Sequence, residues 1–153
     1  MVQRAIKPQT YENLLRHLVA VEENRSQWVH DYFPQISPER KQVVNLLDLY
    51  VRQLEAFLEN SIRSEKSNNE LPFVIMGSQV ELINPETGKR QILEILPLYE
   101  ERIKSHHISI LSPMGSALLL KSKGASVTIK APRGDINWQI ISIKYPENST
   151  PGQ

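Results

Sequence analysis

The stretch that decides the fold is ISILSPMGSALLLKSKGASVTI, residues 108–129. Ser112 followed by Pro113 predicts the start of a short helix, because Ser caps helix N-termini and Pro is tolerated at the first helical position. The helix is expected to cover Met114–Leu120 and to end at Gly124, because Gly readily adopts the left-handed conformation found after helices. Apolar and β-branched residues on both sides of the helix predict two short strands.

Residues 71–146 as a whole have the pattern of a β-rich domain. Phe73–Ile83 is apolar with partial alternation, and Gln91–Leu98 returns as its partner after the turn NPETG at 84–88. Asn137–Tyr145 provides the last strand. Because strands joined by short turns pair in antiparallel fashion, we predict an antiparallel β-sheet domain with one short helix.

Residues 1–66 have the periodicity of helices instead. Large side chains recur at alternating spacings of three and four residues: Tyr11, Leu14, Leu18, Val21, Arg25, Trp28 and Tyr32, and then Val44, Leu47, Val51, Leu54 and Leu58. This spacing is that of a heptad seam, interrupted only by Arg25. Thr10 and Ser37 are candidate N-caps of the two helices. Two seams joined by a short break predict an antiparallel helical hairpin, a coiled coil, and the polar segment Ser64–Glu70 predicts a linker, so the fold class is α+β.

The composition excludes several classes of function. Lys and Arg number 18 and Asp and Glu number 17, so the net charge of +1 favours neither general nucleic-acid binding nor attraction to membranes. There is no cysteine, which excludes disulfides, thiolate metal sites and a Cys nucleophile. The N-terminus has no apolar signal-peptide core, and no run approaches the ~18 apolar residues of a membrane helix. We therefore expect a cytoplasmic protein.

Catalytic motifs are missing as well. The sequence has neither a Gly-x-Ser-x-Gly nucleophile elbow nor a phosphate-binding P-loop. The four histidines have no metal-ligand spacing, and His17 lies off the heptad seam, so we expect it to be solvated. The sequence thus predicts no catalytic residue, no metal site and no cofactor of its own.

The stretch at 108–129, followed by a Pro-Arg-Gly turn and the strand WQIISIKY at 138–145, resembles the C-terminal domain of the GreA/GreB transcription elongation factors. The segment MGSQVELINPETGKRQILEIL at 76–96 is similar to the first hairpin of that domain. The resemblance covers roughly residues 73–145. It implies an FKBP-like sheet with one short helix, placed after the helical hairpin.

The resemblance also implies a partner and a role. In this family the C-terminal domain binds the rim of the secondary channel of bacterial RNA polymerase, and the hairpin enters the channel. This implies a monomer that binds core polymerase, contacts nucleic acid only within the transcription complex, and regulates elongation without being an enzyme itself. The family's polymerase-binding surface corresponds here to Ser112, Pro113, Gly115 and Ser116.

The hairpin tip departs from the family. The family carries a Gly-Asp-Leu-(Ser/Lys)-Glu-Asn type motif there, whose two carboxylates help to hold the catalytic magnesium of polymerase and promote cleavage of backtracked RNA. This chain has HDYFPQISPE at 30–39, in which Asp31 and Glu39 are weak metal candidates and Tyr32 and Phe33 are aromatic. Contact with the polymerase magnesium is therefore at most indirect. Channel occupancy without cleavage, as an inhibitor or competitor of Gre factors, is the alternative function.

Two remote alternatives stay open. An FKBP-like domain suggests a prolyl isomerase, which needs an apolar pocket lined by aromatic side chains. The aromatic residues available after residue 70 are scattered along the chain: Phe73, Tyr99, Trp138 and Tyr145. A self-associating adaptor would use the apolar residues that widen the stripe of the second helix: Leu46, Tyr50 and Phe57.

Overall fold

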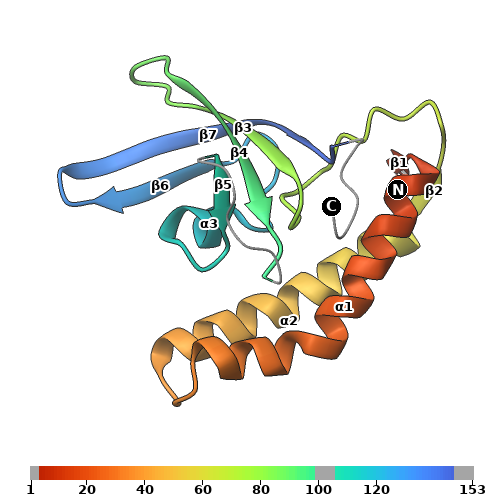
Figure 1. Cartoon of the computed structure of the whole chain (residues 1–153). Coiled ribbons are helices and arrows are strands. Elements are labelled where there is room, and N and C mark those ends of the chain that lie inside the picture. The colour runs from red at the N-terminus through yellow and green to blue at the C-terminus, as the bar shows by residue number, and fades with distance from the viewer. Residues whose placement is uncertain (1–3, 99–105, 147–153) are drawn as a thin grey trace. The chain divides into compact units, whose positions relative to one another are not determined.

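The computed structural model describes residues 4–98 and 106–146. The chain divides into two compact units, and the boundary lies between Asn68 and Asn69, inside the predicted linker. The first unit holds two long helices and two short strands, and the second holds a five-stranded sheet with one short helix (Figure 1). This arrangement confirms the α+β class. In the described parts of the chain no helix is long and apolar enough to cross a membrane.

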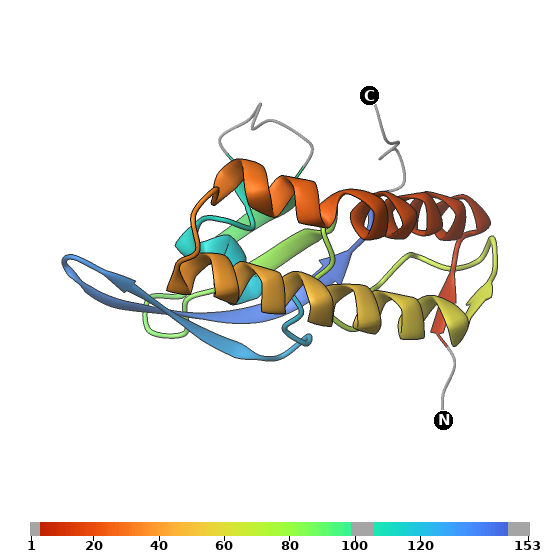
Figure 2. The ribbon, with the colours of Figure 1, turned by 90° about the horizontal axis from the view of Figure 1, so that it is seen from below.

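The first unit is the predicted helical hairpin. Helix α1 (Pro8–Tyr32) and helix α2 (Pro38–Glu59) run side by side in opposite directions (Figures 1 and 2). Ser37 caps α2 as predicted, because its Oγ accepts a hydrogen bond from the backbone N–H of Arg40 at 3.1 Å. Thr10 as the cap of α1 is wrong. The helix begins at Pro8, whose ring fixes φ near the helical value, so Thr10 lies inside the first turns and is buried.

The seam between the helices follows the heptad pattern except near the tip. Most predicted seam positions are buried: Leu14, Leu18, Val21, Leu47, Val51, Leu54 and Leu58. Towards the tip Val29 is buried, whereas Trp28 is only partly buried and Tyr32 is 54% exposed. Val21, Arg25 and Val29 are four residues apart, so the contact line of α1 shifts by one position in its last turns. The predicted burial is therefore wrong for Tyr32 and also for Val44 of α2, which is 37% exposed.

Two very short strands lie beside the open end of the hairpin. Strand β1 (Arg4–Ile6) pairs in parallel with strand β2 (Ser61–Arg63), which follows α2 directly. Ser67 adds a hydrogen bond from its Oγ to the backbone carbonyl of Ala5 at 2.7 Å. Three residues are too few to show strand alternation, so the sequence did not predict this pairing.

The second unit is a curled five-stranded sheet in the order β5-β4-β3-β7-β6. Its elements are β3 (Gln79–Ile83), β4 (Arg90–Leu96), β5 (His107–Ser109), α3 (Pro113–Leu118), β6 (Ser126–Ala131) and β7 (Gly134–Lys144). All neighbouring strands are antiparallel except β4 and β5, which are parallel. The sheet is therefore mixed, and the prediction of an antiparallel sheet is wrong for the β4–β5 pair.

Helix α3 ends earlier than the sequence predicted. Its last residue is Leu118, and Leu120, not Gly124, is the first residue in the left-handed region, with φ of 69°. Two hydrogen bonds of 2.9 Å, from Leu120 N–H to the Val74 carbonyl and from Val74 N–H to the Lys121 carbonyl, fix the chain after the helix. Pairing with Val74 therefore ends α3 before a glycine is reached.

Candidate functional site

Ser112 holds the start of α3. Its Oγ accepts a hydrogen bond from the backbone N–H of Gly115 at 3.0 Å and donates one to the carbonyl of Ser109 at 2.7 Å. These two bonds join the first turn of α3 to the end of β5. Because the hydroxyl is already used in both directions, Ser112 supports the candidate binding surface more than it offers a free polar group.

Gly115 allows α3 to lie close against the end of β5. A Cβ at this position would lie 1.9 Å from the carbonyl oxygen of Ser109 and 3.0 Å from the Cα of Ile110. Both are backbone atoms, so no side-chain movement would relieve the overlap. Gly115 is buried, so it supports the candidate binding surface without being exposed on it.

Pro113 and Ser116 are the exposed members of the predicted polymerase-binding set. They lie one turn apart, and the Ser116 hydroxyl donates a 3.2 Å hydrogen bond to the Pro113 carbonyl. We call Ser112, Pro113 and Ser116 the α3 surface. The exposed Lys121 and Lys123 follow the helix, and neither has an ion pair among the residues described. The α3 surface is thus small and rigid, and two positively charged residues follow it along the chain.

The hairpin tip presents little negative charge. The Asp31 carboxylate is exposed and accepts a 2.8 Å hydrogen bond from Gln27 Nε2. Glu39, in the first turn of α2, is also exposed, whereas Phe33 is partly buried and Ile36 is 94% exposed. The described residues contain no group of three or more His, Cys, Asp or Glu side chains able to hold a metal ion. Magnesium prefers octahedral oxygen ligation, for which this tip offers few ligands.

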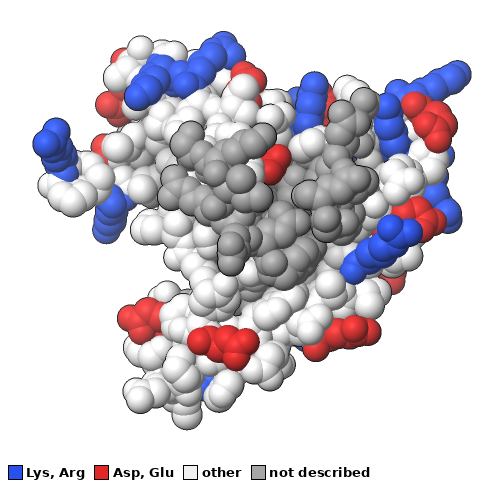
Figure 3. Space-filling model, in the orientation of Figure 1, with Lys and Arg blue, Asp and Glu red and all other residues white. Residues whose placement is uncertain are grey.

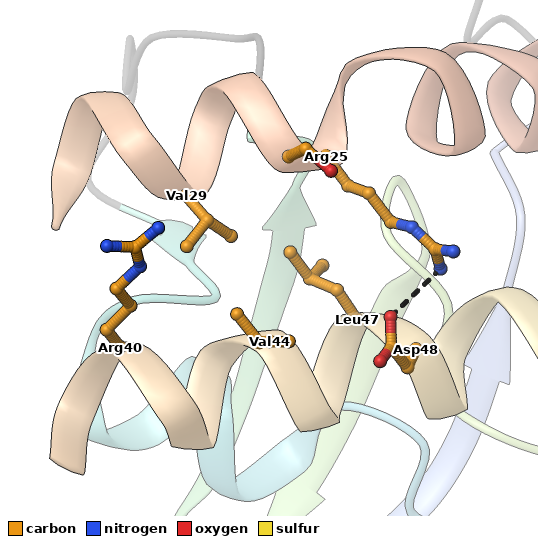
Figure 4. Close-up of a pocket in the computed structure, with 7 residues that line it drawn as sticks. Arg25, Val29, Arg40, Val44, Leu47 and Asp48 are labelled. Atoms are coloured by element: carbon orange, nitrogen blue, oxygen red, sulfur yellow. Dashed lines mark ion pairs between the residues drawn. The ribbon is translucent and has the colours of Figure 1, made fainter. Parts of the chain in front are cut away.

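A hollow between the helices lies close to the tip. It has about 400 Å³ of empty space, partly open to solvent, and its lining residues come from both helices: Arg25, Ser26, Val29, Arg40, Val44, Leu47 and Asp48 (Figure 4). Arg25 Nη1 lies 3.3 Å from Asp48 Oδ1. The sequence showed Arg25 only as a break in the seam, and the residues of α2 that line the hollow carried no signal beside it.

His17 and Tyr50 form a polar pair inside the hairpin. His17 is only 4% exposed, its Nε2 lies 2.7 Å from Tyr50 Oη, and the two rings meet edge to face. The prediction that His17 is solvated is therefore wrong. Burial lowers its pKa from 6.5 to about 4, because desolvation penalises the charged imidazolium. The neutral ring is thus the form that the folded hairpin holds.

The second unit offers little support for the isomerase alternative. Phe73 is partly buried, Trp138 and Tyr145 are buried on and after β7, and Tyr99 lies outside the described residues. A hollow on the sheet is lined by side chains of which none is aromatic: Gln79, Glu81, Ile92, Ser142 and Lys144. The aromatic residues therefore contribute nothing to that hollow.

Charged side chains of both signs are spread over the side of the second unit that Figure 3 shows. Figure 3 shows Lys and Arg at the ends of the β3–β4 and β6–β7 ribbons, with acidic residues beside them. Glu81 and Arg90 even form an ion pair of 3.0 Å across β3 and β4. This face therefore has no field of a single sign that would attract nucleic acid by charge alone.

These features define a class of protein by its architecture. It combines a helical hairpin with a curled sheet whose one short helix presents a rigid surface. The model of the transcription elongation factor GreA/GreB C-terminal family matches residues 68–145, which is about half of the chain. The chain belongs to the GreA/GreB family, and the resemblance stated from its sequence is confirmed.

Curated relatives carry the same family name. Transcription elongation factor GreA of Thioalkalivibrio sulfidiphilus is 38% identical over 96 residues, which are 62% of this chain and 61% of that protein. GreA of Solidesulfovibrio magneticus is 40% identical over 72 residues, 47% of this chain and 44% of that protein. The chain thus aligns with less than two thirds of the length of these relatives.

Solved structures give weaker likenesses. The elongation factor GreA/GreB from Nitrosomonas europaea has a TM-score of 0.49 at 20% identity, with 95% of this chain and 100% of that chain covered. Gfh1 from Thermus aquaticus has a TM-score of 0.43 at 22% identity, with 93% and 98% covered.

Proposed function

We propose that this chain binds RNA polymerase and regulates transcription elongation from the secondary channel. The observation that carries the proposal is the family match over residues 68–145, which includes the whole sheet and α3. The curated relatives are transcription elongation factors by name. The partner is core polymerase in the cytoplasm, and nucleic acid is contacted only within the transcription complex.

The α3 surface is the proposed contact with the channel rim. Pro113 and Ser116 are exposed and offer the contact itself, whereas Ser112 and Gly115 hold the helix in place. A surface held by a cap and a close backbone approach loses little entropy on binding, which favours affinity.

The hairpin is the proposed probe of the channel. Helix α1 has 25 residues and α2 has 22, so at about 1.5 Å per residue each arm is roughly 33–38 Å long. At the tip, Asp31 already accepts a hydrogen bond, and Ile36 and Tyr32 are exposed. A tip of this chemistry supports occupancy of the channel, and hence inhibition or competition with Gre factors, better than support of the polymerase magnesium. The chain then acts as a monomer, without a cofactor and without enzymatic activity of its own.

A Ser116→Arg variant is expected to bind core RNA polymerase at least tenfold more weakly than the intact chain. The long charged side chain would project from the α3 surface and prevent close contact. Gln91→Arg is the matched control, because Gln91 is exposed on β4 and the change adds the same charge and bulk. A competition binding assay measures both. Equal affinity of the two variants would contradict the proposed surface, and failure of the intact chain to bind would contradict the proposed function.

A further inference from the structure

The hollow near the hairpin tip has an apolar floor between two arginines. Val29 and Leu47 are 5% and 1% exposed, and Val44 is 37% exposed. In Figure 4 these three side chains lie between the helices, with Arg40 beside Val29 and Arg25 leaning towards Asp48. The hollow therefore offers a small apolar contact, mainly Val44 above the buried Val29 and Leu47, next to positive charge.

The hollow exists because Arg25 occupies a seam position. An apolar residue there would pack against α2, as Leu18 and Val21 do elsewhere in the seam. Arg25 instead extends to the Asp48 carboxylate, which is 50% exposed. Interiors without such a substitution leave few voids larger than a water molecule.

The charges that line the hollow do not balance. Arg25 and Asp48 compensate each other, whereas Arg40 has no ion pair among the residues that the structure describes. Arg40 is the third residue of α2, where the helix dipole adds partial positive charge. A guanidinium binds a carboxylate through two parallel hydrogen bonds, and the partly buried position of Arg40 strengthens such a pair.

We infer that this hollow receives an acidic side chain of a protein partner, flanked by an apolar side chain that covers the valine and leucine floor. The partner's identity as RNA polymerase rests on the proposed function. A single uncompensated guanidinium matches one carboxylate. A phosphate group with a charge of about −2 would need more positive charge than this single uncompensated guanidinium supplies, which favours a carboxylate as the occupant.

Arg40→Glu tests the inference against Lys41→Glu. Both variants change the charge by two units and lie one residue apart, but Lys41 is exposed and does not line the hollow. We expect Arg40→Glu to weaken binding to core polymerase at least tenfold and Lys41→Glu to change it less than threefold. Val44→Phe fills the hollow without changing charge, and we expect it to weaken binding as well. Helical circular dichroism checks that all three variants are folded.

The outcomes separate the two proposals. If the intact chain does not bind polymerase, the proposed function is contradicted, and with it the partner named here. If the intact chain binds and all three variants bind equally well, only the hollow is contradicted. Titration calorimetry of the isolated chain with ATP tests whether a nucleotide occupies the hollow instead. Binding of ATP that Arg40→Glu abolishes would overturn the inference in favour of a nucleotide.

Discussion

Gly115→Ala is expected to destabilise the second unit by about 3 kcal/mol or more, at the upper end of the cost of overpacking. The added methyl group would lie 1.9 Å from the Ser109 carbonyl oxygen and 2.7 Å from the Ser109 carbonyl carbon. Relief requires a shift of α3 away from the end of β5, which would break the hydrogen bond from Ser112 to the Ser109 carbonyl. A domain with a typical unfolding free energy of roughly 5–15 kcal/mol would lose a large part of its stability.

Urea unfolding followed by circular dichroism measures the effect. Ser116→Ala is the control, because it also introduces an alanine into α3, at the next and exposed position, where only a hydroxyl is lost. We expect this control to change the unfolding free energy by less than about 0.5 kcal/mol, as exposed substitutions usually do. Equal stability of the two variants would show that α3 does not lie against Ser109 as described.

Acidification from pH 7 to pH 4.5 is expected to cost the hairpin about 2 kcal/mol through His17 alone. The pKa of His17 is about 4 in the folded chain and about 6.5 when unfolded. Below pH 6.5 the unfolded chain therefore binds a proton that the folded chain does not, and the unfolding free energy falls as the pH falls. The loss begins near pH 6.5 and levels off below about pH 4.

Urea unfolding of the intact chain, His17→Gln and His30→Gln at pH 7 and pH 4.5 isolates the contribution of His17 to the unfolding free energy. His17→Gln removes the titrating group, so its stability should fall with pH by about 2 kcal/mol less than that of the intact chain. His30→Gln is the matched control, because His30 is exposed in the last turn of α1, and it should behave as the intact chain does. The same pH dependence in the intact chain and His17→Gln would contradict the buried neutral imidazole.

Local sequence chemistry predicted the elements that depend on neighbouring residues. Ser37-Pro38 and Ser112-Pro113 both begin helices, and both serine hydroxyls accept the expected N–H hydrogen bond. The heptad spacing predicted the buried leucines of the hairpin because one buried face on each helix is enough to define the pairing.

Tertiary contacts decided the features that the sequence did not predict. Leu120 adopts a positive φ because Val74, distant in sequence, pairs with the chain there. His17 is buried because Tyr50 on the other helix supplies its polar partner. The β1–β2 pair joins residues more than fifty positions apart, and no local pattern marks it.

For the candidate binding residues, too, the sequence predicted one part and the tertiary structure was needed for the rest. The sequence motif identifies Ser112, Pro113, Gly115 and Ser116 as one set. Only the coordinates show that Pro113 and Ser116 are exposed. The coordinates also show that Gly115 must lack a side chain, because the backbone of Ser109 lies against it. The arginine-lined hollow needs the geometry of two helices, so Arg25 alone did not reveal it.

Transcript cleavage by backtracked RNA polymerase tests channel occupancy most directly. The chain is added in increasing amounts, once alone and once together with a fixed amount of a GreA that stimulates cleavage. We expect no stimulation by the chain alone and a progressive loss of GreA-stimulated cleavage as the chain displaces GreA. Undiminished GreA-stimulated cleavage at an excess of the chain, or stimulation by the chain alone that Asp31→Ala abolishes, would contradict this account.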